Sequence, residues 1–278
     1  MTETSPPLAG VVGWPINHSK SPILHNFWLK KYDVTGHYVP IGLKPQDFEN
    51  GIRALPKLGF KGVNLTIPYK ETILPLLEKV SDRAALIGAV NTITFRENGS
   101  IIGDNTDGYG FIQNLKQSQP GWVPTKGPAL VLGAGGAARA VVSALLSEGV
   151  PEIRITNRTK QRCEVFREQF GARIIISDWN NTADAMKEAT TIVNTTSLGM
   201  VGKSENTIKL DTAPANALVT DIVYTPLKTD FLKRAEDRGL TTVDGLGMLL
   251  HQAVPAFEHW FDIRPDVGPD LREKVLSV

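Results

Sequence analysis

The feature that most constrains the fold of this chain is the glycine cluster Gly133-Ala134-Gly135-Gly136, which separates two contrasting segments. The apolar run Ala129–Leu132 precedes the cluster, and the alanine-rich stretch Ala137–Ser147 follows it. A strand, a glycine turn and a helix in this order are typical of a dinucleotide site. Glycine lets the pyrophosphate approach the backbone, and free N–H groups at the helix start face the phosphates. A purely structural turn is the alternative.

The segments after the cluster alternate between strand and helix patterns. This alternation predicts a parallel sheet covered by helices on both faces, which is a doubly wound, Rossmann-type α/β domain. It also favours the dinucleotide site over a structural turn, because a second strand follows at the right distance. The expected strands are Ala129–Leu132, Glu152–Thr156, Ala172–Ile176, Thr191–Val193, Leu218–Ile222 and Thr241–Val243, with helices at Ala137–Ser147 and Lys160–Phe170.

The residues after the second strand indicate which dinucleotide binds. NAD sites usually carry Asp or Glu there for the ribose hydroxyls, whereas this chain has Asn157-Arg158-Thr159 followed by Lys160 and Arg162. A guanidinium can bind a 2′-phosphate with two charge-assisted hydrogen bonds. A solvated basic helix start is the alternative, but cations there oppose the helix dipole. The sequence therefore predicts NADP(H) as the cofactor.

The first hundred residues have a different pattern, which predicts a separate α/β domain. Asn98-Gly99 between two apolar runs is a hairpin signal, and the proline- and glycine-rich stretch Gln117–Pro128 is the expected domain boundary. Ser21 is a candidate N-cap and Pro22 lies in the first turn of the helix that follows. The expected elements are strands Leu8–Gly13, His37–Ile41, Gly62–Thr66, Asn91–Arg96 and Ser100–Asp104, and helices Ser21–Tyr32, Leu246–Trp260 and Pro269–Leu276.

Polar side chains follow the expected strands of this first domain, and they suit the reduction of a ring ketone. Such a reaction needs a hydride from the dinucleotide and a proton from a positioned acid. Lys70 can supply the proton as an ammonium, and Asp107 can position it. Asn64, Asn91 and Asp107 offer donors and acceptors to a hydroxylated ring, and the hydroxyls of Ser19 and Ser21 can bind its carboxylate.

Each of these residues also has a simpler structural interpretation. Asn91 could serve as a turn residue, and Asp107 and Ser21 as helix N-caps. Their joint occurrence at strand ends favours a substrate site.

Composition and charge exclude several other classes of protein. The 278 residues include 30 Lys and Arg against 29 Asp and Glu, so a net charge of +1 favours neither nucleic acid nor an anionic membrane. No apolar run reaches the roughly 20 residues of a membrane span. The polar segment Met1–Pro7 predicts no signal peptide, and with the single Cys163 it predicts a cytoplasmic protein. His18 and His25 lack partners at ligand spacing, so we expect no metal site.

Several motifs, in this order, resemble those of the shikimate dehydrogenase family. They span residues 8 to 262, which is nearly the whole chain. The matching segments are Gly13-x-Pro15-x-x-His18-Ser19-x-Ser21-Pro22, Asn64-x-Thr66-x-Pro68-x-Lys70, Gly88-Ala89-Val90-Asn91-Thr92, Gly103-Asp104-Asn105-Thr106-Asp107-Gly108, Gly133–Ala137 with Asn157-Arg158-Thr159, and Asp244-Gly245-Leu246-Gly247-Met248-Leu249-x-x-Gln252.

The resemblance implies reversible, NADPH-dependent reduction of 3-dehydroshikimate to shikimate in aromatic amino acid biosynthesis. It implies that Lys70 is the catalytic acid/base and Asp107 its partner. The implied substrate-binding residues are Ser19, Ser21, Asn64, Thr66, Asn91, Tyr224 and Gln252. The implied cofactor-binding residues are Gly133, Ala134, Gly135, Gly136, Ala137, Asn157, Arg158, Thr159, Arg162, Ile222, Gly245 and, as in some members, Asp82.

The family's architecture implies a substrate domain at residues 1–116, an NADP domain at 117–245 and C-terminal helices at 246–278 that return to the first domain, in a monomer or homodimer. Lys20 departs from the usual pattern, because an apolar residue is frequent between the two serines. The alternatives are a quinate/shikimate dehydrogenase, which often prefers NAD, a non-catalytic NADP-binding regulator, and a folate-pathway dehydrogenase. The regulator would have no need for Lys70 with Asp107, and the folate-pathway enzyme would lack the paired serines.

Overall fold

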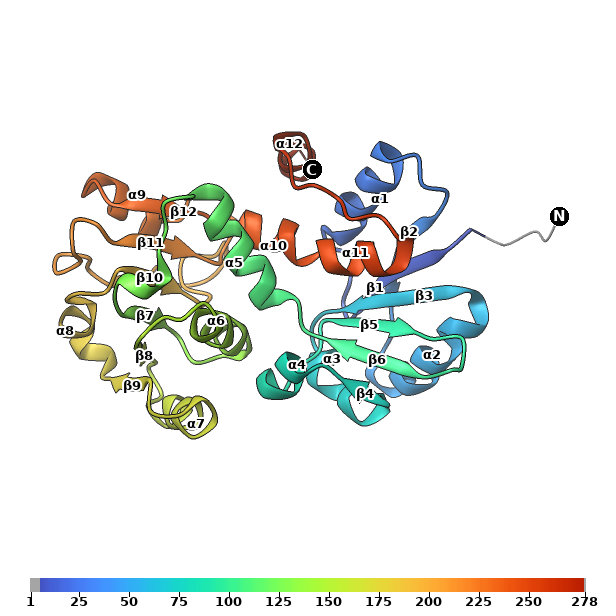
Figure 1. Ribbon diagram of the computed structural model, residues 1–278, viewed down its shortest axis with the longest axis horizontal. Coiled ribbons are helices and arrows are strands. Elements are labelled where there is room, and N and C mark those ends of the chain that lie inside the picture. The colour runs from blue at the N-terminus through green and yellow to red at the C-terminus, as the bar shows by residue number, and fades with distance from the viewer. Residues whose placement is uncertain (1–5, 278) are drawn as a thin grey trace. The chain divides into compact units, whose positions relative to one another are not determined.

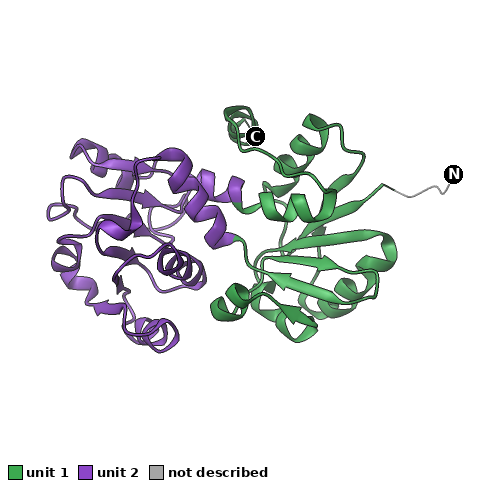
Figure 2. Ribbon diagram, viewed as in Figure 1, with its two compact units in different colours: residues 1–106, 252–278 green, residues 107–251 purple. Residues whose placement is uncertain are grey.

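The computed structural model describes residues 6–277, which form two compact units (Figure 2). Unit 1 comprises residues up to Thr106 together with Gln252 onward, and unit 2 comprises Asp107–His251. Residues 1–5 lie outside the described residues. They belong to the segment Met1–Pro7, for which the sequence predicted no signal peptide. No helix in the described part of the chain is long and apolar enough to cross a membrane.

The two compact units divide before Asp107 and before Gln252, whereas the domains implied by the family resemblance divide after residues 116 and 245. The residues from Asp107 form helix α5 (Asp107–Ser118), which packs on α6 (Gly136–Ser147) of unit 2. A Cβ at Gly108 would lie 2.8 Å from the carbonyl oxygen of Ala140, so glycine allows this close approach. The stretch Gln117–Pro128 therefore lies inside unit 2 and does not separate the two units.

The described residues of unit 1 form a mixed six-stranded sheet (Figure 1). Strands β2, β1 and β3 are parallel, and β5 is antiparallel to both β3 and β6, which confirms the predicted hairpin. In spatial order the strands are β2 (His37–Gly42), β1 (Leu8–Gly13), β3 (Phe60–Leu65), β5 (Thr92–Phe95), β6 (Ile101–Asp104) and β4 (Lys79–Val80).

Helices cover both faces of this sheet. On one face, apolar side chains of β1, β3 and β5 pack against Phe48, Ile52 and Tyr69. On the other face an aromatic cluster joins α1, β2 and α11 through contacts such as Trp28 with Phe257, whose ring centroids lie 5.3 Å apart. The helices of unit 1 are α1 (Ser21–Lys31), α2 (Phe48–Ala54), α3 (Tyr69–Thr72), α4 (Asp82–Ile87), α11 (Val254–Phe261) and α12 (Pro269–Leu276). Helices α11 and α12 thus return to the first part of the chain, as expected, whereas residues 246–251, also expected to return, belong to unit 2.

In unit 2 the described strands form a six-stranded sheet that is parallel throughout, which confirms the doubly wound prediction. Its spatial order is β12 (Thr241–Val243), β11 (Leu218–Asp221), β10 (Thr191–Asn194), β7 (Ala129–Leu132), β8 (Ile153–Thr156) and β9 (Ile174–Ser177). The chain leaves β7 toward β8 and later returns to its other side at β10. The loop after β7 is therefore a topological switch point, where such sheets bind ligands.

Alternate side chains of the central strands fill the two cores of unit 2. Ala129 and Val131 pack under α5, α6 and α7 (Gln161–Phe170), whereas Leu130 and Leu132 pack under α8 (Thr182–Met186) and α9 (Asp230–Asp237). Cys163 lies in the first of these cores, where burial raises the pKa of its thiol to about 11. This thiol is therefore an inert core residue.

Two predictions about helices were wrong. The single helix expected over Leu246–Trp260 is two helices, α10 (Leu246–Gln252) and α11, with Pro255 in the first turn of the second. Proline lacks an N–H and clashes with the carbonyl four residues earlier, so the helix ends before it. Ser21 is not an N-cap, because α1 begins at Ser21 and the capping position belongs to Lys20, without a side-chain cap bond.

Candidate active site

The predicted substrate residues of unit 1 gather at one edge of its sheet. Strands β1, β3 and β6 end at this edge, because β5 is antiparallel to its two neighbours and begins there. The segments that leave β1 and β3 are in contact, since the Trp14 N–H donates to the Ile67 carbonyl over 3.1 Å. Parallel topology thus brings together motifs that lie far apart in the sequence.

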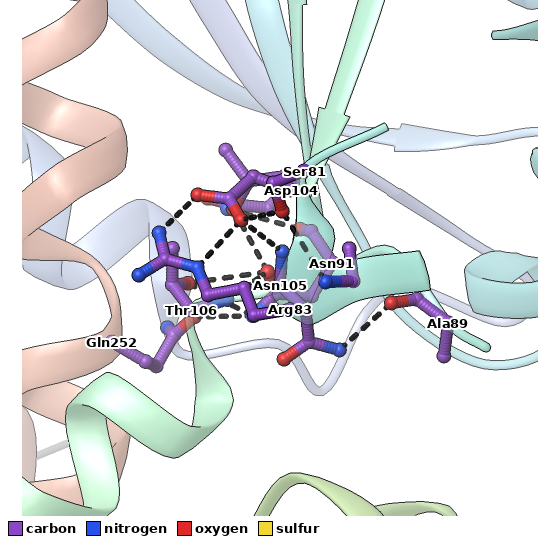
Figure 3. Close-up of polar contacts among 11 residues, drawn as sticks. Ser81, Arg83, Ala89, Asn91, Asp104, Asn105, Thr106 and Gln252 are labelled. Atoms are coloured by element: carbon purple, nitrogen blue, oxygen red, sulfur yellow. Dashed lines mark hydrogen bonds and ion pairs between the residues drawn. The ribbon is translucent and has the colours of Figure 1, made fainter. Parts of the chain in front are cut away.

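A network of buried amides and hydroxyls connects three of these residues. Asn64 faces Thr92 across β3 and β5, and its Nδ2 donates to Thr92 Oγ1 over 3.0 Å. The Thr92 hydroxyl donates to Asn91 Oδ1 over 3.0 Å, and Asn91 Nδ2 donates to Gln252 Oε1 over 3.2 Å. The Thr106 N–H also donates to Asn91 Oδ1, over 2.9 Å (Figure 3). The structure therefore brings Asn64, Asn91 and Gln252 into one hydrogen-bond system.

The role of Thr92 and Thr106 was not predicted from the sequence. Both are buried, and each bonds to the Asn91 side chain. They stand inside the motifs quoted above, directly after Asn91 and directly before Asp107. Their positions next to Asn91 and Asp107 could have identified them as candidates from the sequence.

The end of β6 is fixed beside this network by a charged cluster. The Arg83 guanidinium donates to Asp104 Oδ1 over 2.7 Å, and Asn105 Nδ2 donates to the Ala89 carbonyl over 3.0 Å (Figure 3). Burial opposes ionisation of Asp104, but hydrogen bonds from Arg83 and Ser81 outweigh it and lower the pKa of Asp104. The cluster keeps the loop that carries Thr106 next to Asn91.

The serine loop lies next to this edge, after β1. Ser19 is half-buried, Ser21 is buried, and the Ser21 N–H donates to Ser19 Oγ over 3.4 Å. Lys20, the departure from the family pattern, donates from Nζ to the Val275 carbonyl near the end of α12 over 3.0 Å. A cation is favoured at a helix C-terminus, so this lysine has a structural role.

Thr66 and Lys70 follow β3. Thr66 is half-buried, and a Cβ on Gly13 would lie 2.5 Å from its Cγ2, so glycine permits the close contact between these two segments. Lys70 is half-buried in α3, and its carbonyl accepts a bond of 2.7 Å from the Val90 N–H, directly before Asn91. This bond places the lysine backbone beside the amide network.

Asp107 is the first residue of α5 and is half-buried. It directly follows Thr106, which bonds to Asn91. Asp107 belongs to unit 2 and Lys70 to unit 1, and their pairing stays a prediction.

The glycine cluster of unit 2 has the geometry that a pyrophosphate requires. Gly133 has φ of 106°, a conformation that favours glycine, and a Cβ there would also lie 2.8 Å from Thr196 Cγ2. A Cβ at Gly135 or Gly136 would meet no atom within 4 Å, so the space in front of these residues is open. Helix α6 begins at Gly136, and its first N–H groups lack intrahelical acceptors. These residues fit a dinucleotide phosphate.

The loop after β8 lies beside this cluster. The Ala134 N–H donates to Asn157 Oδ1 over 3.3 Å, and Asn157 Nδ2 donates to the Thr159 carbonyl over 2.9 Å. Arg158, Thr159 and Arg162 are exposed, and neither arginine forms an ion pair with another described residue. Two cations thus stand next to the open glycine loop, as a 2′-phosphate site requires.

Ile222 and Gly245 of unit 2, which were predicted to bind the cofactor, are in contact. A Cβ at Gly245 would lie 2.4 Å from the Ile222 carbonyl oxygen, so these two backbones touch. Tyr224 is half-buried two residues after Ile222, and burial raises the pKa of its hydroxyl.

Asp82 is exposed in the first turn of α4 in unit 1, where a carboxylate interacts favourably with the helix dipole. Its contact with the cofactor stays a prediction.

The histidines have separate environments, and the described residues contain no cluster of metal-ligating side chains. His18 is exposed. His25 is fully buried and stacks on Tyr38, with ring centroids 4.0 Å apart and planes at 1°. Its two ring nitrogens have no hydrogen-bond partner among the described residues. His25 is therefore a packed residue of α1.

His25 makes the stability of the protein depend on pH. Burial lowers its pKa from the ordinary 6.5 to about 3. Below pH 6.5 the unfolded chain therefore binds a proton that the folded protein does not, so stability is complete above pH 6.5 and is lost as the pH falls toward 3. At pH 5 the loss is about 2 kcal/mol. We expect the melting temperature to fall from pH 7 to pH 5, and to fall less in His25→Phe.

Thermal unfolding followed by circular dichroism over this pH range checks the expectation. Some slope will remain in the variant, because burial also lowers the pKa of His251, to about 4. Identical slopes in the variant and the wild type would contradict the assignment.

Comparison with known proteins assigns the chain to a family. Residues 11–93 match the shikimate dehydrogenase substrate binding domain. Residues 123–246 match shikimate / quinate 5-dehydrogenase, and residues 245–272 match the shikimate 5′-dehydrogenase C-terminal domain. The three matches together cover most of the chain.

Individual relatives agree with this result. The chain is 55% identical over 271 residues to shikimate dehydrogenase (NADP(+)) of Paracoccus denitrificans, covering 98% of this chain and 96% of the relative. Shikimate 5-dehydrogenase from Thermus thermophilus, solved with NADP(H) and shikimate, has a TM-score of 0.85 at 38% identity and covers 98% of this chain and 99% of its own. Quinate dehydrogenase from Corynebacterium glutamicum, solved with NAD, has a TM-score of 0.91 at 30% identity. The match covers 99% of this chain and 100% of the quinate dehydrogenase chain. The chain therefore belongs to the shikimate dehydrogenase family.

Proposed function

We propose that this protein is an NADP-dependent oxidoreductase that reduces 3-dehydroshikimate to shikimate, reversibly, in aromatic amino acid biosynthesis. The observation that carries the proposal is the position of Lys70. The bond from the Val90 N–H to its carbonyl places this lysine beside the buried amide network of Asn64, Asn91 and Gln252. The name of the P. denitrificans relative supports the same activity and the same cofactor.

Each group of residues has a distinct part in the reaction. NADPH, when bound, supplies the hydride that attacks the ring ketone. The Lys70 ammonium gives its proton to the ketone oxygen as the carbon–oxygen double bond becomes single, and Asp107 positions that ammonium. The proton then returns to Lys70 from solvent. Ser19 and Ser21 bind the ring carboxylate, and Thr66, Tyr224 and the three amides bind or pack against the ring.

The cofactor is held by backbone and by cations. The N–H groups at the start of α6 would bind the pyrophosphate within the loop Gly133 to Ala137, where the space in front of Gly135 and Gly136 is open. Asn157, Arg158, Thr159 and Arg162 would hold the adenosine 2′-phosphate. Ile222 and Gly245 would contact the nicotinamide, with Asp82 as a weaker cofactor contact.

A spectrophotometric assay of NADPH oxidation with 3-dehydroshikimate tests this function. We expect saturable oxidation of NADPH and formation of shikimate. The alternative, quinate/shikimate dehydrogenase, is tested in the reverse direction with quinate or shikimate and with NAD or NADP. NAD-dependent oxidation of quinate in preference to NADP-dependent oxidation of shikimate would overturn the assignment.

The location and assembly of the protein are further parts of the proposal. We place it in the cytoplasm, on the grounds of its single buried cysteine and its balanced charge. We expect small molecules as its partners, with neither nucleic acid nor membrane among them, and a monomer or homodimer in solution. Light scattering coupled to gel filtration measures the assembly.

A further inference from the structure

Tyr38 is a buried tyrosine that has no part in the function proposed above. It lies on β2, with 2% of its surface exposed. Helix α1 fixes its backbone, because Asn26 Nδ2 donates to the Tyr38 carbonyl over 2.8 Å and the Tyr38 N–H donates to Asn26 Oδ1 over 3.2 Å. Its ring stacks on His25. Backbone and ring are therefore both fixed, and only the hydroxyl remains to be explained.

The Tyr38 hydroxyl points to the proposed substrate residues. It donates to Asn64 Oδ1 over 2.7 Å, inside the protein. Burial raises the pKa of Tyr38 well above its ordinary value, an effect that a hydrogen bond from Ser21 only partly opposes. The hydroxyl therefore stays protonated at neutral pH, and it can act as a donor to Asn64.

From Asn64 the hydrogen bonds continue in one direction. Asn64 Nδ2 donates to Thr92 Oγ1 over 3.0 Å and to the Asn91 carbonyl over 3.2 Å. Thr92 then donates to Asn91 Oδ1, and Asn91 donates to Gln252. Both hydrogens of the Asn64 amide are used and its Oδ1 accepts from Tyr38, so three hydrogen bonds fix the orientation of this amide. Buried chains of this kind strengthen each of their members.

We propose that Tyr38 is a positioning residue for substrate binding, which fixes the orientation of the Asn64 amide and, through Thr92, that of Asn91. The inference rests on the proposed function, because that function gives Asn64 and Asn91 their substrate roles. Without the tyrosine hydroxyl, the buried Oδ1 loses a hydrogen-bond donor, while the two bonds that Nδ2 donates remain.

The variant Tyr38→Phe removes only this hydroxyl and keeps the ring that stacks on His25. We expect the KM for 3-dehydroshikimate to rise about tenfold, which corresponds to one lost net hydrogen bond. The KM for NADPH should not change, and kcat should change by less than about threefold, because the proton donor is untouched.

Tyr32→Phe is a matched control in the same unit. The Tyr32 hydroxyl accepts a bond of 3.0 Å from the Asp266 N–H, away from the amide network. This variant loses an equivalent hydroxyl and should keep the wild-type KM for 3-dehydroshikimate.

Thr92 provides an independent test if Tyr38→Phe folds poorly. Thr92→Val breaks the chain of hydrogen bonds at its next member and should also raise the KM for 3-dehydroshikimate, whereas Thr92→Ser keeps the hydroxyl and should restore it. In an Asn64→Ala background, Tyr38→Phe should have little further effect, because the group it positions is gone.

The outcomes separate this inference from the proposed function. Wild-type protein that does not oxidise NADPH with 3-dehydroshikimate would overturn the proposed function and, with it, this inference. An active wild type whose KM for 3-dehydroshikimate is unchanged by both Tyr38→Phe and Thr92→Val would overturn the inference alone. Effects of Tyr38→Phe and Asn64→Ala that simply multiply would likewise overturn it, because they would indicate a merely structural tyrosine.

Discussion

Replacing Lys70 with alanine is expected to lower the turnover of 3-dehydroshikimate by at least about 10²-fold while NADPH binding is retained. The ketone oxygen gains negative charge as the hydride arrives, and without the ammonium only water can protonate it. A 10²-fold loss corresponds to about 2.7 kcal/mol of the activation barrier. Steady-state kinetics gives the turnover, and fluorescence titration gives the affinity for NADPH.

Lys57→Ala is the control for this experiment, because Lys57 is an exposed lysine of the same unit and has no proposed role. It should have wild-type kinetics. Unchanged turnover in Lys70→Ala would exclude the mechanism.

Asp107 tests the other half of the proposed pair. Asp107→Asn removes the charge and keeps a side chain that can cap α5, so it separates catalysis from helix stability. We expect a loss of turnover like that of Lys70→Ala. The double variant Lys70→Ala/Asp107→Ala should be little worse than Lys70→Ala alone, because the two groups act as a unit. Multiplied effects in the double variant would contradict their pairing.

Replacing Arg158 with aspartate is expected to lower kcat/KM for NADPH by about 10²-fold and to leave activity with NADH nearly unchanged. The guanidinium no longer binds the 2′-phosphate, and the new carboxylate repels it. NADH lacks that phosphate and makes neither interaction. Initial rates with both cofactors, measured at saturating 3-dehydroshikimate, give the ratio directly.

Arg167→Asp is the matched control for Arg158. It makes the same change of charge on an exposed residue of α7 and breaks only a surface ion pair with Glu164, which contributes little stability. It should leave the preference for NADPH intact. An equal loss with NADPH and NADH in Arg158→Asp would refute the assignment of this residue to the 2′-phosphate.

Local sequence patterns predicted the elements well where they were strongly periodic. The strands at Ala129–Leu132 and Thr241–Val243 and the helix at Pro269–Leu276 have the bounds that the sequence indicated. Apolar alternation and helix-start signals are properties of neighbouring residues, so they are visible without the fold. The split at Pro255 differed, because proline overrides a helical pattern, and the N-cap of α1 is Lys20 instead of Ser21.

The candidate site also has one part that the sequence indicated and another that only the structure revealed. Gly133 and Arg158 could be proposed from sequence, because a phosphate site uses consecutive backbone groups and a nearby cation. The partners of Asn64 could not be, since Tyr38, Thr92 and Asn91 come from separate strands. The orientation of that amide depends on all of them together. No local pattern contains this information.

By itself, the sequence determined the doubly wound unit, the type of cofactor and the chemical groups available for catalysis, because these depend on short segments. Tertiary structure decided where the units divide, which helices return to the first sheet, and how the buried amides are oriented. The physical reason is that burial and hydrogen-bond direction depend on residues brought together by the sheet order. Asn91 and Gln252, far apart in the chain, bond directly for that reason.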